Sequence, residues 1–202
     1  MRSSLDKVGS TQTEASMTKA SFKIRTSTLE DLPELFDLER RALTQLNDGD
    51  YPDDIIEQFL EELDTITPEL IEEGRYYVFQ DDAGSLIASG GWSQKIPGYA
   101  SGIVSGHTSA YAKEEAVIRA MYVCPQMARR GLGRKMMNLI ESEAMKAGVS
   151  RMLLSATKMG ARLYRACGYI TTGPTVISLS GGRQIQGEDM EKQLTNQCDT
   201  AA

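Results

Sequence analysis

Residues 117–137 constrain the fold of this chain more than any other segment. The segment begins with an apolar stretch that predicts a strand, which Pro125 ends, and it continues through a short turn with two glycines into an amphipathic helix. This order leaves the first backbone N–H groups of the helix without partners. Such amides and the positive end of the helix dipole together favour a phosphorylated ligand. The segment therefore predicts a phosphate-binding turn between a strand and a helix.

The predicted turn is basic as well as glycine-rich. A Cβ atom at Gly131 or Gly133 would keep a pyrophosphate away from the backbone, so glycine suits both positions. The cations around the turn are Arg129, Arg130, Arg134 and Lys135. We therefore predict a pyrophosphate-binding loop.

Two common phosphate loops do not match this turn. The loop of nucleotide hydrolases needs Gly-x-x-x-x-Gly-Lys-Ser/Thr, which the chain lacks, and the dinucleotide fingerprint needs a small residue where Met136 stands. The order of strand, Pro125, Arg-Arg-Gly-Leu-Gly-Arg and helix resembles the acetyl-CoA loop of the GNAT acetyltransferase superfamily. Residues 160–169 are similar to the second motif of that family, a helix with Leu-Tyr that is closed here by Gly168 and Tyr169.

The resemblance implies an α/β (α+β) fold, a single domain with a central mixed, mostly antiparallel twisted sheet flanked by helices. We expect this domain over 21–195, with disordered tails at 1–20 and 196–202. Hydrophobic periodicity predicts strands at 22–25, 75–80, 86–92, 117–123, 151–155, 175–179 and 189–194. It predicts helices at about 28–43, 55–63, 133–147 and 159–167, and residues 93–115 are typical of a loop.

Composition limits the function classes. The 202 residues, 41% hydrophobic and 25% charged, are typical of one soluble domain, and no run of about 18 apolar residues predicts a membrane span. Three cysteines and one histidine favour neither a disulfide framework nor a metal centre, so we expect a cytoplasmic protein without a metal. An acidic chain with a pI near 5.0 makes nucleic acid a poor partner.

The resemblance also implies how acetyl-CoA binds. Backbone amides of Met121, Tyr122 and Val123 would pair with the pantetheine arm, and one of them would lie near the thioester oxygen. Thr157 stands where the family often has an asparagine that bonds the pantetheine, and Ala128 stands where it often has Gln or Arg. The residues that would hold the pyrophosphate are Arg129, Arg130, Gly131, Leu132, Gly133 and Arg134.

Tyr164 matches the family's tyrosine that donates a proton to the departing CoA sulfur. A phenol suits this role because its ordinary pKa of about 10 exceeds that of a thiol. By itself, the residue is equally consistent with an aromatic side chain packed on a helix face.

The sequence offers several candidates for the general base that deprotonates the acceptor amine. Glu115, at the start of the central strand, is the first candidate, and its alternative is a solvated charge at a strand end. His107, Asp48 and Asp50 lie in predicted loops and are further candidates. Arg119, inside an apolar strand, is expected either to reach the substrate cleft or to pair with an acid.

The acceptor side has one clue. Between Arg41 and Arg75 there are eleven Asp or Glu residues and no Lys or Arg. A negative wall would concentrate a cationic amine, although acidic outer helix faces that serve solubility are the alternative. Candidate substrate contacts are Asp48, Asp50, Trp92, His107 and Arg119.

The sequence thus predicts an N-acetyltransferase that moves the acetyl group of acetyl-CoA to a primary amine by direct attack in a ternary complex. A small cationic amine is the favoured acceptor. The alternatives are a protein or peptide N-acetyltransferase and a non-catalytic acyl-CoA-binding regulatory module. A homodimer is expected from the resemblance alone.

Overall fold

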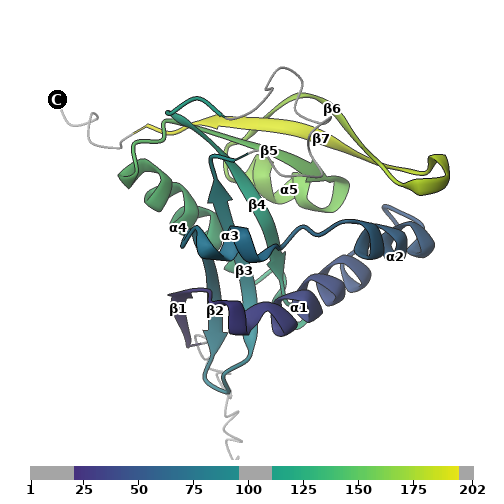
Figure 1. Ribbon diagram of the computed structural model, residues 1–202, viewed down its shortest axis with the longest axis horizontal. Coiled ribbons are helices and arrows are strands. Elements are labelled where there is room, and N and C mark those ends of the chain that lie inside the picture. Colours follow the sequence, from purple (N-terminus) through teal and green to yellow (C-terminus); the bar gives the residue numbers. More distant parts are fainter. Residues whose placement is uncertain (1–20, 96–110, 196–202) are drawn as a thin grey trace, which may run out of the picture.

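The computed structural model describes residues 21–95 and 111–195, and it consists of a twisted sheet flanked by helices (Figure 1). The strands are β1 (Phe22–Thr26), β2 (Tyr76–Asp81), β3 (Leu86–Ser93), β4 (Glu115–Val123), β5 (Arg151–Thr157), β6 (Ile170–Ser178) and β7 (Gln184–Gln193). The α-helices are α1 (Leu32–Gln45), α2 (Asp53–Glu62), α3 (Pro68–Glu72), α4 (Leu132–Lys146) and α5 (Lys158–Ala166). The tails expected at 1–20 and 196–202 lie outside the described residues.

The seven strands follow the order β1-β2-β3-β4-β5-β7-β6. Strands β4 and β5 run parallel and the other neighbours in this order run antiparallel, which confirms the predicted mixed, mostly antiparallel sheet. All eight residues of β3 are buried, so both faces of the sheet centre are covered. Helices α1 and α4 both pack on β3 and β4, and α5 packs on β5 and β7.

Strands β4 and β5 separate after a short paired stretch. Their register joins residues 115–117 to 151–153, and β4 then continues to Val123 while β5 continues to Thr157 without further pairing between them. Beyond this point the edge of each strand faces a gap instead of a neighbouring strand. The divergence creates the space in which the candidate site lies.

The sequence predicts the start of the first helix at Thr28, which together with Asp31 resembles a capping box. The Asp31 carboxylate accepts a hydrogen bond from the Thr28 backbone N–H at 2.8 Å, which completes a capping box before a 3-10 turn at Leu29–Asp31 and then α1. The apolar residues on the buried face of α1 are Leu35, Leu38, Ala42 and Leu43, whereas Phe36, expected on this face, is exposed.

Two parts of the fold differ from the sequence-based expectation. Helix α3 was not predicted; it is short, and Thr67 caps it by accepting from the Leu70 N–H at 3.3 Å. Strands β6 and β7 are longer than expected because they pair with each other over most of their length, although β7 is largely polar. Pairing between strands can order a polar segment that has no apolar alternation of its own. The expected loop at 93–115 falls partly on residues 96–110, outside the described residues.

Candidate functional site

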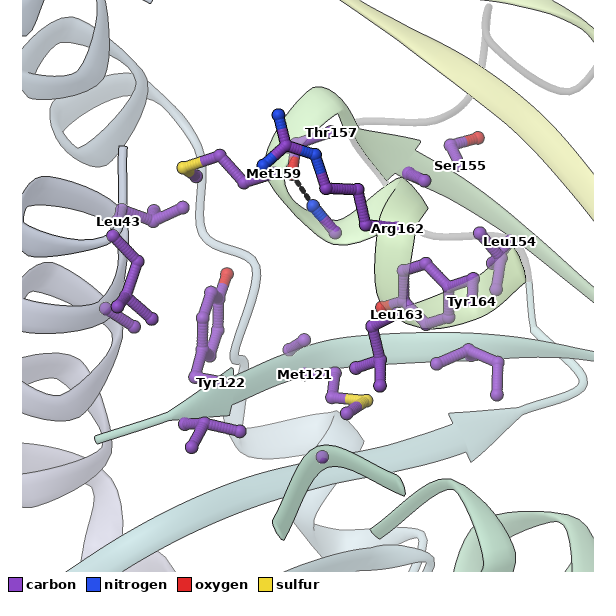
Figure 2. A pocket seen from close by; sticks show the side chains of 18 of the residues that line it. Leu43, Met121, Tyr122, Leu154, Ser155, Thr157, Met159, Arg162, Leu163 and Tyr164 are labelled. Carbon is purple, nitrogen blue, oxygen red and sulfur yellow. Dashed lines mark hydrogen bonds between the residues drawn. The ribbon is translucent and has the colours of Figure 1, made fainter. Parts of the chain in front are cut away.

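A cavity of about 560 Å³ lies between the diverging ends of β4 and β5. Figure 2 shows Tyr122 of β4 and Leu43 of α1 on one side of it, and Leu163 and Tyr164 of α5 on the other. The cavity is lined largely by apolar side chains, with charged side chains from the turn before α4 and from the loop after α1. A concave, mostly apolar space with a few polar groups is typical of a small-molecule site.

A bulge in β4 shapes the floor of the cavity. Ala120 has a φ of 46°, in the left-handed region, and the pairing of β4 with β3 shifts register between Ser89 and Gly91. The Tyr76 hydroxyl donates to the Ala120 carbonyl at 2.6 Å and holds this backbone in place. The bulge turns the end of β4 toward the cavity, where Met121, Tyr122 and Val123 form part of the lining.

The predicted phosphate loop forms one end of the cavity. Gly131 is the N-cap residue of α4 with a φ of 81°, a conformation that favours glycine, and among the described residues no side chain caps this helix. The first amides of a 15-residue helix are therefore available to an anion. The residues of this loop that line the cavity include Arg129, Gly131, Gly133 and Arg134.

Gly133 has a second reason to be glycine that the sequence did not reveal. A Cβ atom at this position would lie 2.9 Å from Leu163 Cδ2, which is closer than real Cβ atoms approach. The first turn of α4 can therefore pack closely against Leu163 of α5 because Gly133 has no side chain. This contact brings the phosphate loop next to the helix that carries Tyr164.

Three residues assigned to the loop have other surroundings. Arg130 is exposed and Leu132 is buried in the core, and neither lines the cavity. The ammonium of Lys135 lies 4.9 Å from the centre of the Phe22 ring, over β1. Lys135, one of the cations predicted around the turn, thus points to the sheet edge and is not part of the cavity lining.

Helix α5 supplies the opposite wall. Thr157 caps it by accepting from the Gly160 N–H at 3.3 Å, and both Thr157 and Tyr164 line the cavity (Figure 2). Arg162 of α5 also lines the cavity and was missed from the sequence, although it lies two residues before the tyrosine of the second motif. With Arg129 and Arg134 it brings a third cation to the cavity wall.

The loop after α1 carries two of the predicted acidic residues to the cavity. Asp48 and Asp50 both line it. Asn47 holds this loop, since its Nδ2 donates to the Tyr51 carbonyl at 2.6 Å and its Oδ1 accepts from the Tyr51 N–H at 3.0 Å. The two carboxylates therefore project from a well-braced turn.

Tyr51 bridges the loop after α1 to the other side of the cavity. Its hydroxyl donates to the Gln186 carbonyl of β7 at 2.6 Å and accepts from the Lys158 N–H of α5 at 2.8 Å. Around this bridge, α2 packs on the end of the β6–β7 hairpin in a second apolar cluster that contains Phe59, Leu179 and Ile185. Figure 1 shows the hairpin reaching over the side of the molecule where α2 lies.

Part of the acidic charge of α2 has a structural role. Glu62 accepts from the Ser180 N–H at 2.8 Å, and Asp54 forms an ion pair with Arg183, so both carboxylates attach α2 to the tip of the hairpin. Ser180 holds the pKa of Glu62 below its ordinary value by hydrogen bonding. The acidic stretch thus divides into residues that join two elements and residues, such as Asp48 and Asp50, that face the cavity.

Three further predicted site residues within the described ranges are not brought to the cavity. Glu115 lies at the paired end of β4, where Oε1 accepts from Arg151 Nη1 at 2.6 Å. Trp92 is buried in the core under the Arg75 guanidinium, 4.3 Å from the ring centre. Arg119 is buried and its Nη2 donates to the Thr65 carbonyl at 3.4 Å. None of these three lines the cavity, so this placement argues against Glu115 as the base, and His107 lies outside the described residues.

Within the described ranges, no group of three or more His, Cys, Asp or Glu side chains is arranged to hold a metal ion. No helix in the same ranges is long and apolar enough to cross a membrane.

Comparison with known proteins gives a family match and a fold match. The sequence profile of the acetyltransferase (GNAT) family matches residues 34–169. A search of curated protein sequences gives no match.

Solved structures of low sequence identity share the fold. The PaiA N-acetyltransferase of Thermoplasma acidophilum in complex with coenzyme A is 19% identical with a TM-score of 0.59, over 86% of this chain and 99% of that one. YncA of Salmonella typhimurium with its cofactor acetyl-CoA is 18% identical with a TM-score of 0.57, over 91% and 99%. The ribosomal-protein-S18-alanine N-acetyltransferase of Escherichia coli is 16% identical with a TM-score of 0.56, over 90% and 99%.

Proposed function

The chain belongs to the GNAT acetyltransferase family, and from this membership we propose that it transfers the acetyl group of acetyl-CoA to a small cationic primary amine by direct attack. The observation that carries the proposal is the cavity between β4 and β5, which has an uncapped helix N-terminus with arginines in one part and two carboxylates in another. A thioester is already reactive, so holding it in line with an amine is the main requirement.

The donor side suits acetyl-CoA. The amides at the start of α4 and the side chains of Arg129, Arg134 and Arg162 would hold the pyrophosphate. The edge of β4 beyond the bulge has no pairing with β5, and backbone amides in the stretch from Met121 to Val123 would pair there with the pantetheine arm. One of these amides would stabilise the developing oxyanion.

Tyr164 is our candidate for the proton donor to the leaving thiolate. It lines the cavity from α5, and the close packing of Gly133 against Leu163 places that helix beside the phosphate loop. Its ring also meets the Tyr169 ring edge-on, with centroids 5.9 Å apart, which fixes its orientation. A phenol can protonate a thiolate because its ordinary pKa is higher.

The acceptor side supports a small amine. Asp48 and Asp50 would attract a cation, and the Tyr51 bridge to Gln186 joins the two sides of the molecule across this region. On this basis we place a small cationic amine, rather than a protein N-terminus or a lysine side chain, beside these carboxylates.

The test is a CoA-release assay with purified protein and acetyl-CoA across polyamines, amino sugars, amino acids, arylamines and peptides. We expect turnover on polyamines or amino sugars and a raised melting temperature with acetyl-CoA. Turnover confined to peptides would shift the acceptor to proteins. Stabilisation without turnover would favour a binding module, and the absence of both would contradict the assignment of the loop.

The matched variants are Asp48→Asn with Asp50→Asn, against Asp53→Asn with Glu57→Gln on the acidic helix α2 outside the cavity lining. If the cavity carboxylates attract the amine, the first pair raises KM for the amine roughly tenfold, a loss of about 1.4 kcal/mol, and leaves KM for acetyl-CoA unchanged. If the two double variants raised KM for the amine equally, the acidic stretch would act only through its overall charge and not through Asp48 and Asp50.

A further inference from the structure

One carboxylate interrupts the apolar stripe of α1. Leu35, Leu38, Ala42 and Leu43 form the buried face of this helix, and Glu39 lies among them with 5% of its surface exposed. Position 39 has the helical spacing of a core residue, so an apolar side chain would be expected there. Burying a carboxylate costs folding free energy unless it is hydrogen-bonded, so the partners of Glu39 indicate what it does there.

Glu39 is held by two hydroxyl groups. Its Oε1 accepts from Thr65 Oγ1 at 2.5 Å and from the Tyr122 hydroxyl at 2.6 Å. The two hydroxyl oxygens are themselves 2.8 Å apart. Three oxygens from α1, the segment before α3 and β4 thus form a closed triangle of short contacts.

The triangle has one hydrogen fewer than its contacts need. Thr65 and Tyr122 each supply one hydroxyl hydrogen, and an ionised carboxylate supplies none. When both hydrogens point to Glu39 Oε1, the contact between Oγ1 and Oη joins two lone pairs. A third proton would complete the ring of hydrogen bonds, so the cluster is built to accept a proton.

The cluster reaches the cavity through its hydroxyl groups. Thr65 and Tyr122 both line the cavity, whereas Glu39 does not. Figure 2 shows the Tyr122 ring standing in the cavity wall, on the side opposite Tyr164. A ligand in the cavity therefore meets the cluster at Tyr122 or Thr65, and Glu39 lies behind these two residues.

Resting on the acetyl transfer proposed above, we propose that Tyr122 and Glu39 form a proton relay that deprotonates the acceptor amine. The ammonium N–H bond breaks as its proton moves to Tyr122 Oη, while the original hydroxyl proton of Tyr122 moves to Glu39 Oε1. The products are a neutral amine with a free electron pair and a neutral Glu39 carboxyl. Tyr122 is the catalytic residue of the pair, and Glu39 acts through it.

The electrostatic surroundings agree with this division. Burial raises the pKa of Glu39, while hydrogen bonds from Thr65 and Tyr122 oppose the shift, so the carboxylate is a stronger base than an exposed glutamate. Burial, and then the Glu39 charge, raise the pKa of Tyr122 well above its ordinary value, so its hydroxyl passes a proton on and does not ionise. The other charged or titratable groups facing the cluster are Arg40, Asp64, Tyr76 and Arg119.

The first test compares pH profiles of kcat/KM with spermidine, or with the best amine of the panel, for the wild type, Glu39→Gln and Tyr122→Phe. At pH 7 we expect both variants to lose about 100-fold, which is typical of a removed general base. The wild-type profile should rise as Glu39 ionises and then level off. The variant profiles should continue to rise toward the pKa of the amine, about 10.4 for an alkylamine, because only the neutral amine reacts.

The matched control is Glu141→Gln, which changes a buried glutamate of α4 that pairs with Lys192 away from the cavity. It should keep the wild-type profile. The relay would be overturned if kcat/KM of Glu39→Gln and Tyr122→Phe fell by the same factor at every pH. It would also be overturned if the kcat/KM profiles of both variants levelled off at the same pH as that of the wild type. Tyr122→Phe keeps the ring, so it serves as the second variant if Glu39→Gln fails to fold.

A second measurement does not depend on turnover. Infrared difference spectra of wild type against Glu39→Gln, recorded with acetyl-CoA across pH, isolate the Glu39 carboxyl band. Protonation with a midpoint above the ordinary glutamate value of about 4.3 supports the relay, and an ordinary midpoint overturns it. If no amine is acetylated by the wild type, the proposed function fails; normal wild-type turnover with unaltered variant profiles overturns the relay alone.

Discussion

The two ends of the β4–β5 pair place a glutamate in opposite settings. At the paired end, Glu115 lies beside Arg151, which also contacts Glu191 across the sheet. At the divergent end, Glu39 is buried against β4 with the hydroxyls of Thr65 and Tyr122 as its hydrogen-bond partners. A cation partner thus keeps a carboxylate ionised in a structural role, whereas a buried carboxylate held by neutral hydroxyls retains its capacity to accept a proton.

The largest effect in this comparison is expected at the divergent end, across the cavity from Glu39. Tyr164→Phe should lower kcat about 100-fold, because the leaving thiolate loses its proton donor, and should leave the Kd for acetyl-CoA almost unchanged. Steady-state kinetics and calorimetric binding check this.

The control for Tyr164 is Tyr77→Phe, since Tyr77 is a half-buried tyrosine of β2 outside the cavity lining. An equal loss of kcat in both variants, or none in Tyr164→Phe, would remove Tyr164 from the mechanism and leave it as a packed aromatic residue.

The second prediction concerns the contact that positions α5. In Gly133→Ala the new methyl group would lie 2.9 Å from Leu163 Cδ2, so the Leu163 side chain or the first turn of α4 must shift. We expect the Kd for acetyl-CoA to rise roughly tenfold, in line with an overpacking cost of about 1–3 kcal/mol. Gly173→Ala is the control, because nothing lies within 4 Å of a Cβ at that position. Leu163→Ala in the Gly133→Ala background should restore binding, and a failure to do so would argue against the contact.

The third prediction tests the paired end directly. Glu115→Gln removes one partner of a partly exposed ion pair while Glu191 stays beside Arg151, so the free energy of unfolding should fall by at most about 1 kcal/mol. The values of kcat and KM should stay as in the wild type. Urea unfolding and steady-state kinetics measure both, and a kcat/KM loss above tenfold would return Glu115 to the list of candidate bases.

The smallest effect concerns Asp31, whose pKa is shifted in the direction opposite to that of Glu39. The hydrogen bond from Arg25 lowers the pKa of Asp31, so its stabilisation is present above the ordinary value of about 3.9 and is lost as pH falls through the folded value. Asp31→Asn should cost less than about 1 kcal/mol at pH 7, since Arg25 is 35% exposed.

Urea unfolding of the wild type and Asp31→Asn between pH 7 and pH 3 measures the shift. The difference in free energy of unfolding between the wild type and Asp31→Asn should become smaller as pH falls toward 3. For Glu39→Gln the difference in free energy of unfolding between wild type and variant should change with pH in the opposite direction. Burial raises the Glu39 pKa, so ionisation of that carboxyl in the wild type costs stability as pH rises. A constant difference across pH for Asp31→Asn would contradict the ion pair as the cause.

Local patterns in the sequence were enough for the family, the strand–turn–helix around 117–137 and the capping box before α1, because each depends on residues close together in the chain. They also placed Tyr164 and the two cavity carboxylates among the candidates. Glu39 left a readable signal as a charged residue inside an apolar stripe, and the helical spacing of α1 could have drawn attention to it.

Tertiary structure decided the rest. Glu115 lies where β4 and β5 are paired, and Glu39 lies against β4 where the two strands have separated. Which of the two glutamates has the surroundings of a general base therefore depends on strand pairing and not on the residue type. The close approach of Gly133 to Leu163 joins segments that are separate in the chain, and only packing reveals it. The residue types along the chain define which chemical groups this protein carries. The divergence of β4 and β5 decides which of these groups meet, because burial and partner choice arise only when distant segments pack together.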